Sequence, residues 1–399
     1  VKIPSVCCEK LFFCVIMKKT GSPGGFGPLQ PFTLKEVIMR KAIKRILLAL
    51  LAIIIVAAAA FTGVYFTRLQ SMGSIQKLTA YADYNLYRMD VKYDYDLDKL
   101  LSACKADNQS LIDALLKEAL PLLPIQMKAP DFGCSAFTVN TPDGQVLMGR
   151  NYDFKNNSSA MLVYCSPRNG YKSVATAALD NISANQVDGV KSKLACLTAP
   201  FICLDGVNEK GVSIAVLTLD SKPTLQSTGK EVLATPMVIR LVLDRAATTE
   251  EAVALIAQYD MFATSGRDYH FYITDASGDG RVVEFDCLSE KREMVVTPSQ
   301  TATNFFVMYA DQVLPDQRNG VYGHGRERYD RIEEILAAAQ DTATKDTAWD
   351  ALKAASQAPK EGDITSNTQW SIVYNNTELT AEIAIRRDWD TLTAYALAQ

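Results

Sequence analysis

The hydrophobic and polar positions divide the chain into three parts with different patterns. Residues 46–66 are apolar and carry no charge. Residues 97–123 place apolar side chains at helical spacings, which predicts an amphipathic helix. From residue 134 onward, short apolar runs alternate with turn residues, which is typical of strands. We therefore expect an apolar segment, a mainly helical leader and a strand-rich domain.

The apolar run of residues 46–66 is long enough to cross a membrane. At 1.5 Å per residue, about 20 helical residues span a bilayer core of about 30 Å. Basic residues precede the run and only Arg68 follows it closely, so we expect a single-pass membrane protein with everything after Thr67 outside the cytoplasm. A cleaved signal peptide is the alternative, because residues 57–60 are small alanines. The protein would then be secreted.

The strand-rich part opens with a predicted hairpin. The runs CSAFTVN and QVLMGRN flank the turn Thr141-Pro142-Asp143-Gly144. Further strands are expected at 161–164, 201–204, 212–219, 270–274, 281–285 and 370–374, and helices at 236–246, 248–259 and 325–339. Strands, then helices, then strands again favour an α+β layered domain over a doubly wound parallel sheet.

Composition and charge narrow the classes of partner. The 399 residues are 48% hydrophobic and 22% charged, which is sufficient for a large globular domain. The formal net charge is -4 and the basic residues are dispersed, so we do not expect nucleic acid as a partner. No HExxH, CxxC or His/Asp cluster has the spacing of metal ligands, and we expect neither a metal nor another cofactor.

The cysteines allow at most partial disulfide pairing. If Cys134 is a free thiol, five cysteines remain after the apolar run, and an odd number cannot pair completely within one chain. Cys196 and Cys203 are the candidate pair, with free buried cysteines as the alternative.

Cys134 lacks an evident histidine base. The chain has two histidines, His270 in a predicted strand and His324 in a glycine-flanked loop, and neither accompanies a GxSxG motif. The α-amine of an N-terminal residue has a pKa of about 7.7–8.0 and can act as a base at neutral pH. Cleavage between Gly133 and Cys134 would therefore place a nucleophile and a base on one residue. A small buried cysteine is the alternative.

Several short segments resemble the choloylglycine hydrolase and penicillin V acylase family. They are CSAF at 134–137, DG at 143–144, GRNYD at 149–153, DGVNEKGV at 205–212, YITDASG at 272–278, VE at 283–284, TNFF at 303–306, RERYDR at 326–331 and SIVY at 371–374. Related N-terminal-nucleophile hydrolases include acid ceramidase and the N-acylethanolamine acid amidase. The resemblance implies a four-layer αββα fold and hydrolysis of a linear C-N amide bond through an acyl-enzyme.

The resemblance also implies roles around the cleaved bond. Cys134 would be the nucleophile, exposed when its thiol attacks the carbonyl of Gly133 and the thioester hydrolyses. Arg150 would favour the thiolate, and Asp153 would hold the α-ammonium group. Taken alone, Arg150 could be a surface arginine at a strand end and Asp153 a turn residue.

Three further positions follow from the same resemblance. Asn304 would donate its amide to the oxyanion, a role worth about 3–4 kcal/mol. Arg328 corresponds to the family's second arginine, with Arg326 as the alternative. Thr218 stands where many members have asparagine, so it is an expected oxyanion or substrate contact that lacks the amide. On their own, Asn304 could be a turn residue and Arg328 a solvated helix-face residue.

These expectations order the chain into four segments. Residues 1–45 would be a cytoplasmic segment, unless the true start is Met39, and residues 46–66 would be the anchor or signal. Residues 67–133 would be a helical pro-segment or a membrane-proximal stalk, and residues 134–399 the catalytic domain. The expected substrate is an N-acylated small molecule or lipid amide, and an oligomer is left open. An acyltransferase on the same fold and a non-catalytic membrane-anchored binding module are the alternatives.

Overall fold

The structure is a computed structural model that describes residues 34–80, 84–121, 133–154, 157–318, 320–362 and 366–397. It divides into two units, Val1–Gly63 and Val64–Gln399. The expected N-terminal segment lies outside the described residues as far as residue 33, together with Cys7, Cys8 and Cys14.

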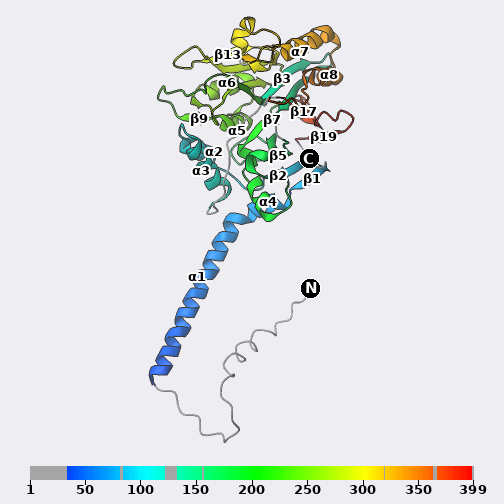
Figure 1. The fold of residues 1–399 in the computed structure, drawn as a ribbon. Coiled ribbons are helices and arrows are strands. Elements are labelled where there is room, and N and C mark those ends of the chain that lie inside the picture. The colour runs from blue at the N-terminus through cyan, green and yellow to red at the C-terminus, as the bar shows by residue number, and fades with distance from the viewer. Residues whose placement is uncertain are drawn as a thin grey trace. The chain divides into compact units, whose positions relative to one another are not determined.

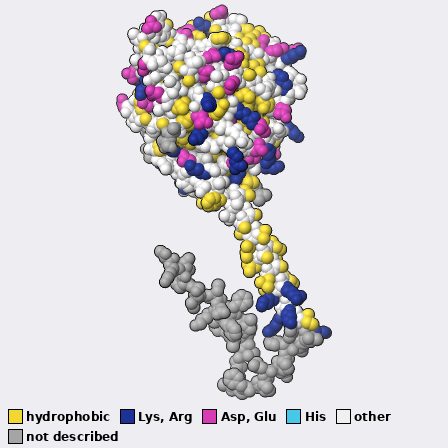
Figure 2. Space-filling view, turned by 180° about the vertical axis from the view of Figure 1, so that it is seen from behind, with side chains coloured by type: hydrophobic (Ala, Val, Ile, Leu, Met, Phe, Trp, Pro, Cys, Tyr) yellow, Lys and Arg dark blue, Asp and Glu magenta, His cyan; other side chains and the backbone are white. Residues whose placement is uncertain are grey.

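Helix α1, Leu34–Gly73, contains the apolar run. Its part Ile38–Gly73 is long and apolar enough to cross a membrane, and none of its most apolar stretch is buried. Figure 2 shows hydrophobic side chains along this helix and a group of basic side chains near its start. A membrane span and a signal sequence share these properties, so the choice between them stays a prediction.

The larger of two main sheets has nine strands in the order β1-β2-β5-β6-β7-β8-β11-β12-β13. Neighbouring strands are antiparallel except β2 and β5, which pair in parallel. The strands are β1 Gln76–Ala80, β2 Asn85–Asp90, β5 Ala160–Cys165, β6 Ser173–Ala178, β7 Cys203–Asn208, β8 Ser213–Leu219, β11 Asp268–Thr274, β12 Arg281–Phe285 and β13 Met294–Pro298.

The smaller main sheet has six strands in the order β14-β3-β4-β17-β18-β19, all antiparallel to their neighbours. They are β3 Gly133–Asn140, β4 Val146–Asp153, β14 Thr301–Ala302, β17 Thr368–Asn375, β18 Thr380–Ile385 and β19 Leu392–Ala396. Two short pairs complete the strands, β9 Val232–Ala234 with β10 Asp260–Phe262 and β15 Asn304–Phe305 with β16 Gly323–His324.

Helices cover the outer faces of both sheets (Figure 1). Helices α5 and α6 pack on the larger sheet, α7 and α8 pack on the smaller sheet, and β3 contacts β8 and β11 across the interface between the sheets. This is the expected αββα order of layers. The helices are α2 Leu97–Ala103, α3 Asn108–Ala119, α4 Val190–Cys196, α5 Thr235–Arg245, α6 Thr249–Ile256, α7 Arg326–Ala339 and α8 Lys345–Ala355, with 3-10 turns at Leu179–Ile182, Ala199–Phe201, Val307–Gln312 and Gln340–Thr342.

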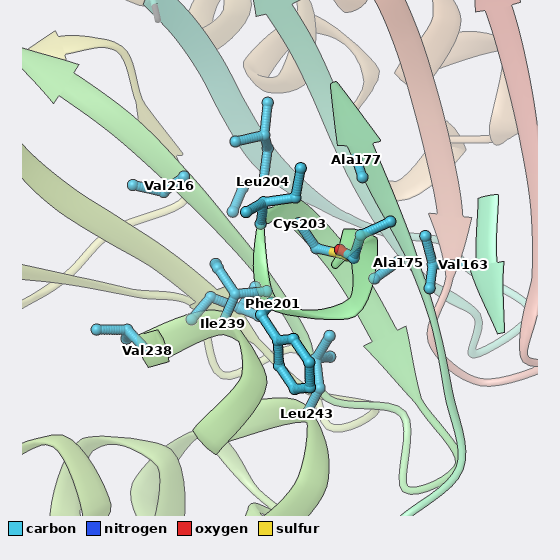
Figure 3. Packing of buried hydrophobic residues seen from close by; sticks show 14 of the residues in the cluster. Val163, Ala175, Ala177, Phe201, Cys203, Leu204, Val216, Val238, Ile239 and Leu243 are labelled. Carbon is cyan, nitrogen blue, oxygen red and sulfur yellow. The ribbon is translucent and has the colours of Figure 1, made fainter. Parts of the chain in front are cut away.

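Helix α5 packs on the outer face of the larger sheet and forms the core of that layer. Pro236 occupies its first turn, where the missing N–H costs nothing, and every residue from Thr235 to Asp244 is buried. Figure 3 shows Ile239 and Leu243 of this helix beside Phe201, over strands that contribute further apolar side chains. Burying each large aliphatic side chain contributes about 1.5–3 kcal/mol, so this layer holds the strands below the site in place.

The leader contains two strands besides its helices, which the hydrophobic pattern did not predict. Its segments Gln76–Ala80 and Asn85–Asp90 are strands of the larger sheet. The first pairs with the second and the second with β5, and this pairing outweighs their weak local pattern. The single helix expected over 97–123 is instead α2 and α3, separated where the Asp107 side chain accepts from Ser110 N at 2.7 Å and caps α3. The leader residues 122–132 lie outside the described part.

The proposed disulfide between Cys196 and Cys203 is wrong. Both thiols are buried and free, and the Cys203 thiol donates to the carbonyl oxygen of Ala199 at 3.2 Å. The alternative of free buried cysteines is therefore confirmed for this pair. Cys104, Cys134, Cys165 and Cys287 are free as well.

Candidate active site

The expected hairpin places the candidate residues around Cys134. Strands β3 and β4 pair antiparallel, with Cys134 opposite Tyr152 and Ala136 opposite Arg150. Gly144 in the connecting turn has a φ of +85°, a left-handed conformation that glycine adopts without steric cost. The hairpin thus makes Arg150, sixteen residues after Cys134, its diagonal neighbour on the adjacent strand.

The alternation of side chains along β4 divides the site between two faces of the smaller sheet. Arg150 points toward the larger sheet, where its Nη2 donates to the carbonyl oxygen of Val216 at 3.0 Å. Asn151 points the other way, and its Nδ2 donates to the carbonyl oxygen of Leu352 in α8 at 2.9 Å. Cys134, in register with the even-numbered residues of β4, therefore faces the interface between the sheets.

Arg150 is a fully buried cation beside the thiol. Its charge acts to lower the pKa of the Cys134 thiol, and its Nε forms an ion pair with Asp205 Oδ2 at 3.3 Å. The alternative of a surface arginine is excluded, since its side chain is 0% exposed. Tyr374 donates to the other oxygen of Asp205 at 2.5 Å, which satisfies the buried carboxylate.

Asp153 is the last residue of β4 and lies in register with Gly133, the first residue of β3. Its Oδ1 accepts from Thr368 Oγ1 at 2.6 Å, and its Oδ2 accepts from Gln357 Nε2 at 2.8 Å. Arg328 Nη1 lies 3.5 Å from the same Oδ2. These contacts hold a buried carboxylate next to the peptide bond between Gly133 and Cys134.

Asn304 contacts the backbone nitrogen of Cys134. Its Oδ1 accepts from Cys134 N at 3.1 Å and from Arg328 Nη2 at 2.7 Å. Its Nδ2 donates one of its two hydrogens to the carbonyl oxygen of Thr218 at 2.8 Å. Asn304 is therefore part of the site and not an isolated turn residue.

Arg328, and not Arg326, is the arginine of α7 that joins the site. Its Nη1 donates to the carbonyl oxygen of Cys134 at 3.1 Å, and its Nε is buried without a hydrogen-bond partner. Arg326 instead pairs with Asp330 at 2.6 Å on a partly exposed face of the helix. The close approach of Arg328 to Gly325 (φ +90°) leaves no room for a side chain there.

Thr218 lies at the edge of this cluster, at the end of β8. Its carbonyl oxygen accepts from Asn304, while its hydroxyl is buried without a hydrogen-bond partner. A buried hydroxyl without a partner costs free energy. The Thr218 hydroxyl is therefore unusual, and it is free to form a hydrogen bond next to the candidate site.

Burial dominates the ionisation of the site in the uncut chain. It raises the pKa of the Cys134 thiol to about 11, although the charge of Arg150 acts in the opposite direction. Burial also raises the pKa of the Asp153 carboxyl, against the charge of Arg328 and the hydrogen bonds from Thr368 and Gln357. At neutral pH the uncut chain therefore holds a protonated thiol that is 0% exposed.

The histidines have other partners. His324 Nδ1 lies 2.5 Å from Asp220 Oδ2, and His270 Nδ1 lies 2.9 Å from Glu284 Oε1. Among the described residues, no group of three or more His, Cys, Asp or Glu side chains has the arrangement of a metal site.

Sequence reasoning missed three side chains that complete the site. Asp205 opens the segment DGVNEKGV that resembles the family, so that segment was a usable signal for the partner of Arg150. Gln357 and Thr368 bind Asp153 from outside any recognised segment, and no sequence signal indicates them.

Comparisons with known proteins support the resemblance. The family model described as linear amide C-N hydrolases, choloylglycine hydrolase family, matches residues 134–300. Two variants of conjugated bile acid hydrolase from Clostridium perfringens are each 17% identical, cover 66% of this chain and 92% of their own, and give TM-scores of 0.50 and 0.49. Penicillin V acylase from Agrobacterium tumefaciens is 18% identical, with coverages of 67% and 87% and a TM-score of 0.47. A search of curated proteins finds no match.

At such identities the structural likeness concerns the fold, and the match at a TM-score of 0.50 is to an N-terminal-nucleophile hydrolase fold of mixed helices and sheets. The family match covers the strands that carry Cys134, Arg150, Asp153 and Thr218. The resemblance of this chain to the choloylglycine hydrolase family of linear amide C-N hydrolases is thus supported by a family match over residues 134–300.

Proposed function

We propose that the chain is an amidohydrolase whose nucleophile is Cys134, freed by autocleavage of the bond after Gly133. The observation that supports this most strongly is the surroundings of the Cys134 backbone nitrogen. Asn304 Oδ1 already accepts from it at 3.1 Å. The buried carboxylate of Asp153 lies in register with Gly133, one residue away. A new α-amine would therefore meet groups that bind an ammonium or receive its proton.

The cleavage proceeds by an N-to-S acyl shift. The thiol of Cys134 attacks the carbonyl carbon of Gly133, the C–N bond breaks, and the nitrogen takes a proton to become the α-amine. Water then hydrolyses the thioester, which leaves a carboxylate on Gly133 and a thiol on Cys134. The buried charge of Arg150, which acts to lower the pKa of that thiol, stabilises the negative charge that develops on sulfur.

Turnover uses the same groups on an external amide. The α-amine of Cys134 takes the thiol proton, the sulfur attacks the substrate carbonyl, and the proton passes to the leaving amine as the C–N bond breaks. Water, deprotonated by the α-amine, then hydrolyses the acyl-enzyme. Asn304 Nδ2, with one hydrogen left, and Thr218 Oγ1 are the side-chain donors available to the oxyanion.

The substrate class is an N-acylated small molecule or a lipid amide. The family match supports hydrolysis of a linear amide. A membrane-spanning α1 with the catalytic part outside the cytoplasm would place the site where lipid amides are available, and a cleaved signal would give a secreted enzyme instead. Acyl transfer to an amine is the second candidate, since the acyl-enzyme is common to both reactions.

The test compares wild-type full chain with Cys134→Ala. We expect the wild type to yield a fragment whose N-terminal residue is Cys134 and to release amine from a panel of bile salts, penicillin V and N-acylethanolamines. Cys134→Ala should show neither. Adding an acceptor amine distinguishes acyl transfer from hydrolysis by the product formed. A wild-type chain that stays uncut and hydrolyses no member of the panel would leave only the non-catalytic binding module.

A further inference from the structure

His270 and Glu284 form a buried pair that no step of the proposed reaction uses. They lie on the neighbouring strands β11 and β12, and both side chains are 0% exposed. Their closest atoms, His270 Nδ1 and Glu284 Oε1, are 2.9 Å apart. A buried pair of this kind costs desolvation free energy, which good hydrogen bonds must offset. The other hydrogen bonds of the His270–Glu284 pair therefore indicate which part of the chain it fixes in place.

The histidine holds the first residue of the segment Thr303–Met308. His270 Nε2 lies 2.8 Å from the carbonyl oxygen of Thr303. A carbonyl oxygen only accepts, so Nε2 is the donor and carries a proton. Thr303 is further fixed by its hydroxyl, which donates to the carbonyl oxygen of Gly325 at 3.0 Å. The peptide group that leads into Asn304 is thus held by a buried imidazole.

The glutamate holds the end of the same segment. Glu284 Oε1 accepts from Val307 N at 2.7 Å, and its Oε2 accepts from Met308 N at 2.9 Å. Both nitrogens belong to the first residues of a 3-10 turn, whose backbone N–H groups have no partner within the turn. One carboxylate therefore satisfies two donors and also faces the imidazole.

Asn304 lies between these two attachment points. Its side chain makes all its contacts at the site, to Cys134, Arg328 and the Thr218 carbonyl. Its amide must hold a fixed position, because a donor misplaced by about 1 Å can lose most of its effect on the transition state. We propose that His270 and Glu284 are positioning residues that clamp Thr303–Met308 and so place Asn304 at Cys134. The kinetic consequence of the clamp rests on the proposed function.

Two substitutions of His270 separate its contacts. Gln at this position can place its Nε2 where the imidazole Nε2 lies, which keeps the bond to Thr303. Asn reaches only as far as Nδ1, which keeps the contact to Glu284. We expect His270→Gln to keep kcat within about threefold and His270→Asn to lower it about tenfold or more, with KM changed less than threefold in both. A loss of similar size in both variants, or none in either, would overturn the proposal.

Coupling to Asn304 provides the second kinetic test. If His270 acts through Asn304, His270→Asn should lower kcat much less in an Asn304→Ala background than in the wild type. Additive losses would show that the histidine acts elsewhere. Tyr272→Phe is the matched control, because Tyr272 lies on the same strand as His270. The substitution removes buried hydrogen bonds to Thr138 and Gln300 but no contact to the segment Thr303–Met308. It should lower stability and leave kcat unchanged.

Hydrogen exchange of the full chain tests the clamp without any turnover. In a Cys134→Ala background, we expect His270→Leu to speed exchange of the amides of residues 303–308 and of residue 134, whose N–H is bound by Asn304. Unchanged exchange at these positions would overturn the clamp even if the enzyme is active. If wild-type protein hydrolyses no amide while exchange responds as expected, the proposed function fails and the structural clamp stands.

Discussion

Arg328 Nη1 donates to the carbonyl oxygen of Cys134 at 3.1 Å. A residue of α7 thereby holds the backbone of the residue that cleavage would expose as a new N-terminus. The same guanidinium donates from Nη2 to Asn304 Oδ1 at 2.7 Å, which in turn accepts from Cys134 N. The planar guanidinium of Arg328 thus sets the distance between the Cys134 backbone on β3 and the Asn304 side chain on β15.

Replacing Arg328 with lysine should separate these contacts. A lysine ammonium is a point charge on a flexible stem and cannot serve both acceptors in the geometry of the fork. We expect Arg328→Lys to lower kcat about 100-fold and stability by about 1–3 kcal/mol, since one buried acceptor loses its donor. Steady-state kinetics and urea unfolding measure the two effects.

Arg326→Lys is the matched control for this prediction. Arg326 lies on the same helix and pairs with Asp330 at four residues' separation on a partly exposed face. Such pairs contribute about 0.3–0.5 kcal/mol, so kcat should change less than twofold. Equal losses in the two variants would contradict the assignment of Arg328 to the site.

Thr218→Val should separate stability from catalysis. The Thr218 hydroxyl is buried without a partner, so replacing it with an isosteric methyl removes a desolvation cost. We expect stability to rise by about 1 kcal/mol and kcat to fall about tenfold, because the oxyanion loses a donor. A kcat equal to that of the wild type would show that the hydroxyl does not contact the oxyanion.

The residues of the site that lie on one hairpin were predictable from sequence. The turn Thr141–Gly144 and its flanking runs fix the register of β3 and β4, and that register alone places Arg150 diagonal to Cys134. The start of the helix expected over 248–259 was equally local, because the Thr248 side chain accepts from Glu251 N and caps α6. These features depend on residues that are close together in the chain, so they can be predicted from a single sequence.

Features that depend on distant pairing were not predictable. Strand β2 has no strong strand pattern of its own, and its parallel pairing with β5 exists only in the folded chain. Gln357 and Thr368 reach Asp153 because α8 and β17 pack beside β4. The burial that raises the pKa of Cys134 likewise arises from both sheets together.

The stability of the uncut chain should depend on Cys134 at alkaline pH. Its pKa rises from an ordinary value of 9.0 to about 11 in the folded chain, because burial disfavours the thiolate. Because the pKa is raised in the folded chain, the contribution of the protonated Cys134 thiol to the free energy of unfolding is complete below about pH 9. It is lost as the pH rises through about 11. A shift of this size corresponds to about 3 kcal/mol. Unfolding free energies at pH 8 and pH 12 measure it.

The comparison requires a chain that stays uncut. Gly133→Val supplies it, because a branched side chain hinders attack on the neighbouring carbonyl. We expect the alkaline loss to be about 3 kcal/mol smaller in Gly133→Val with Cys134→Ala than in Gly133→Val alone. Other buried thiols such as Cys196, whose pKa burial raises to about 12, titrate in both variants and cancel in the difference. An identical loss in both would contradict the buried thiol at this position.

Cleavage at Cys134 should leave the leader bound to the body of the protein. Strand β2 pairs with β5 from Leu86 to Asp90, and Leu100 and Leu115 of the leader helices are each only 2% exposed. Removing the two terminal strands β1 and β2 from the larger sheet, with these apolar side chains, would cost several kcal/mol, far more than one broken peptide bond returns in chain entropy.

We therefore expect the two fragments to elute together in native size exclusion and to separate only in denaturant. Leu86→Asp, which places a charge in the buried strand, should release the leader fragment after cleavage, whereas Lys99→Asp on an exposed position of α2 should not. Leader and body separating in wild-type protein would contradict the pairing of β2 with β5.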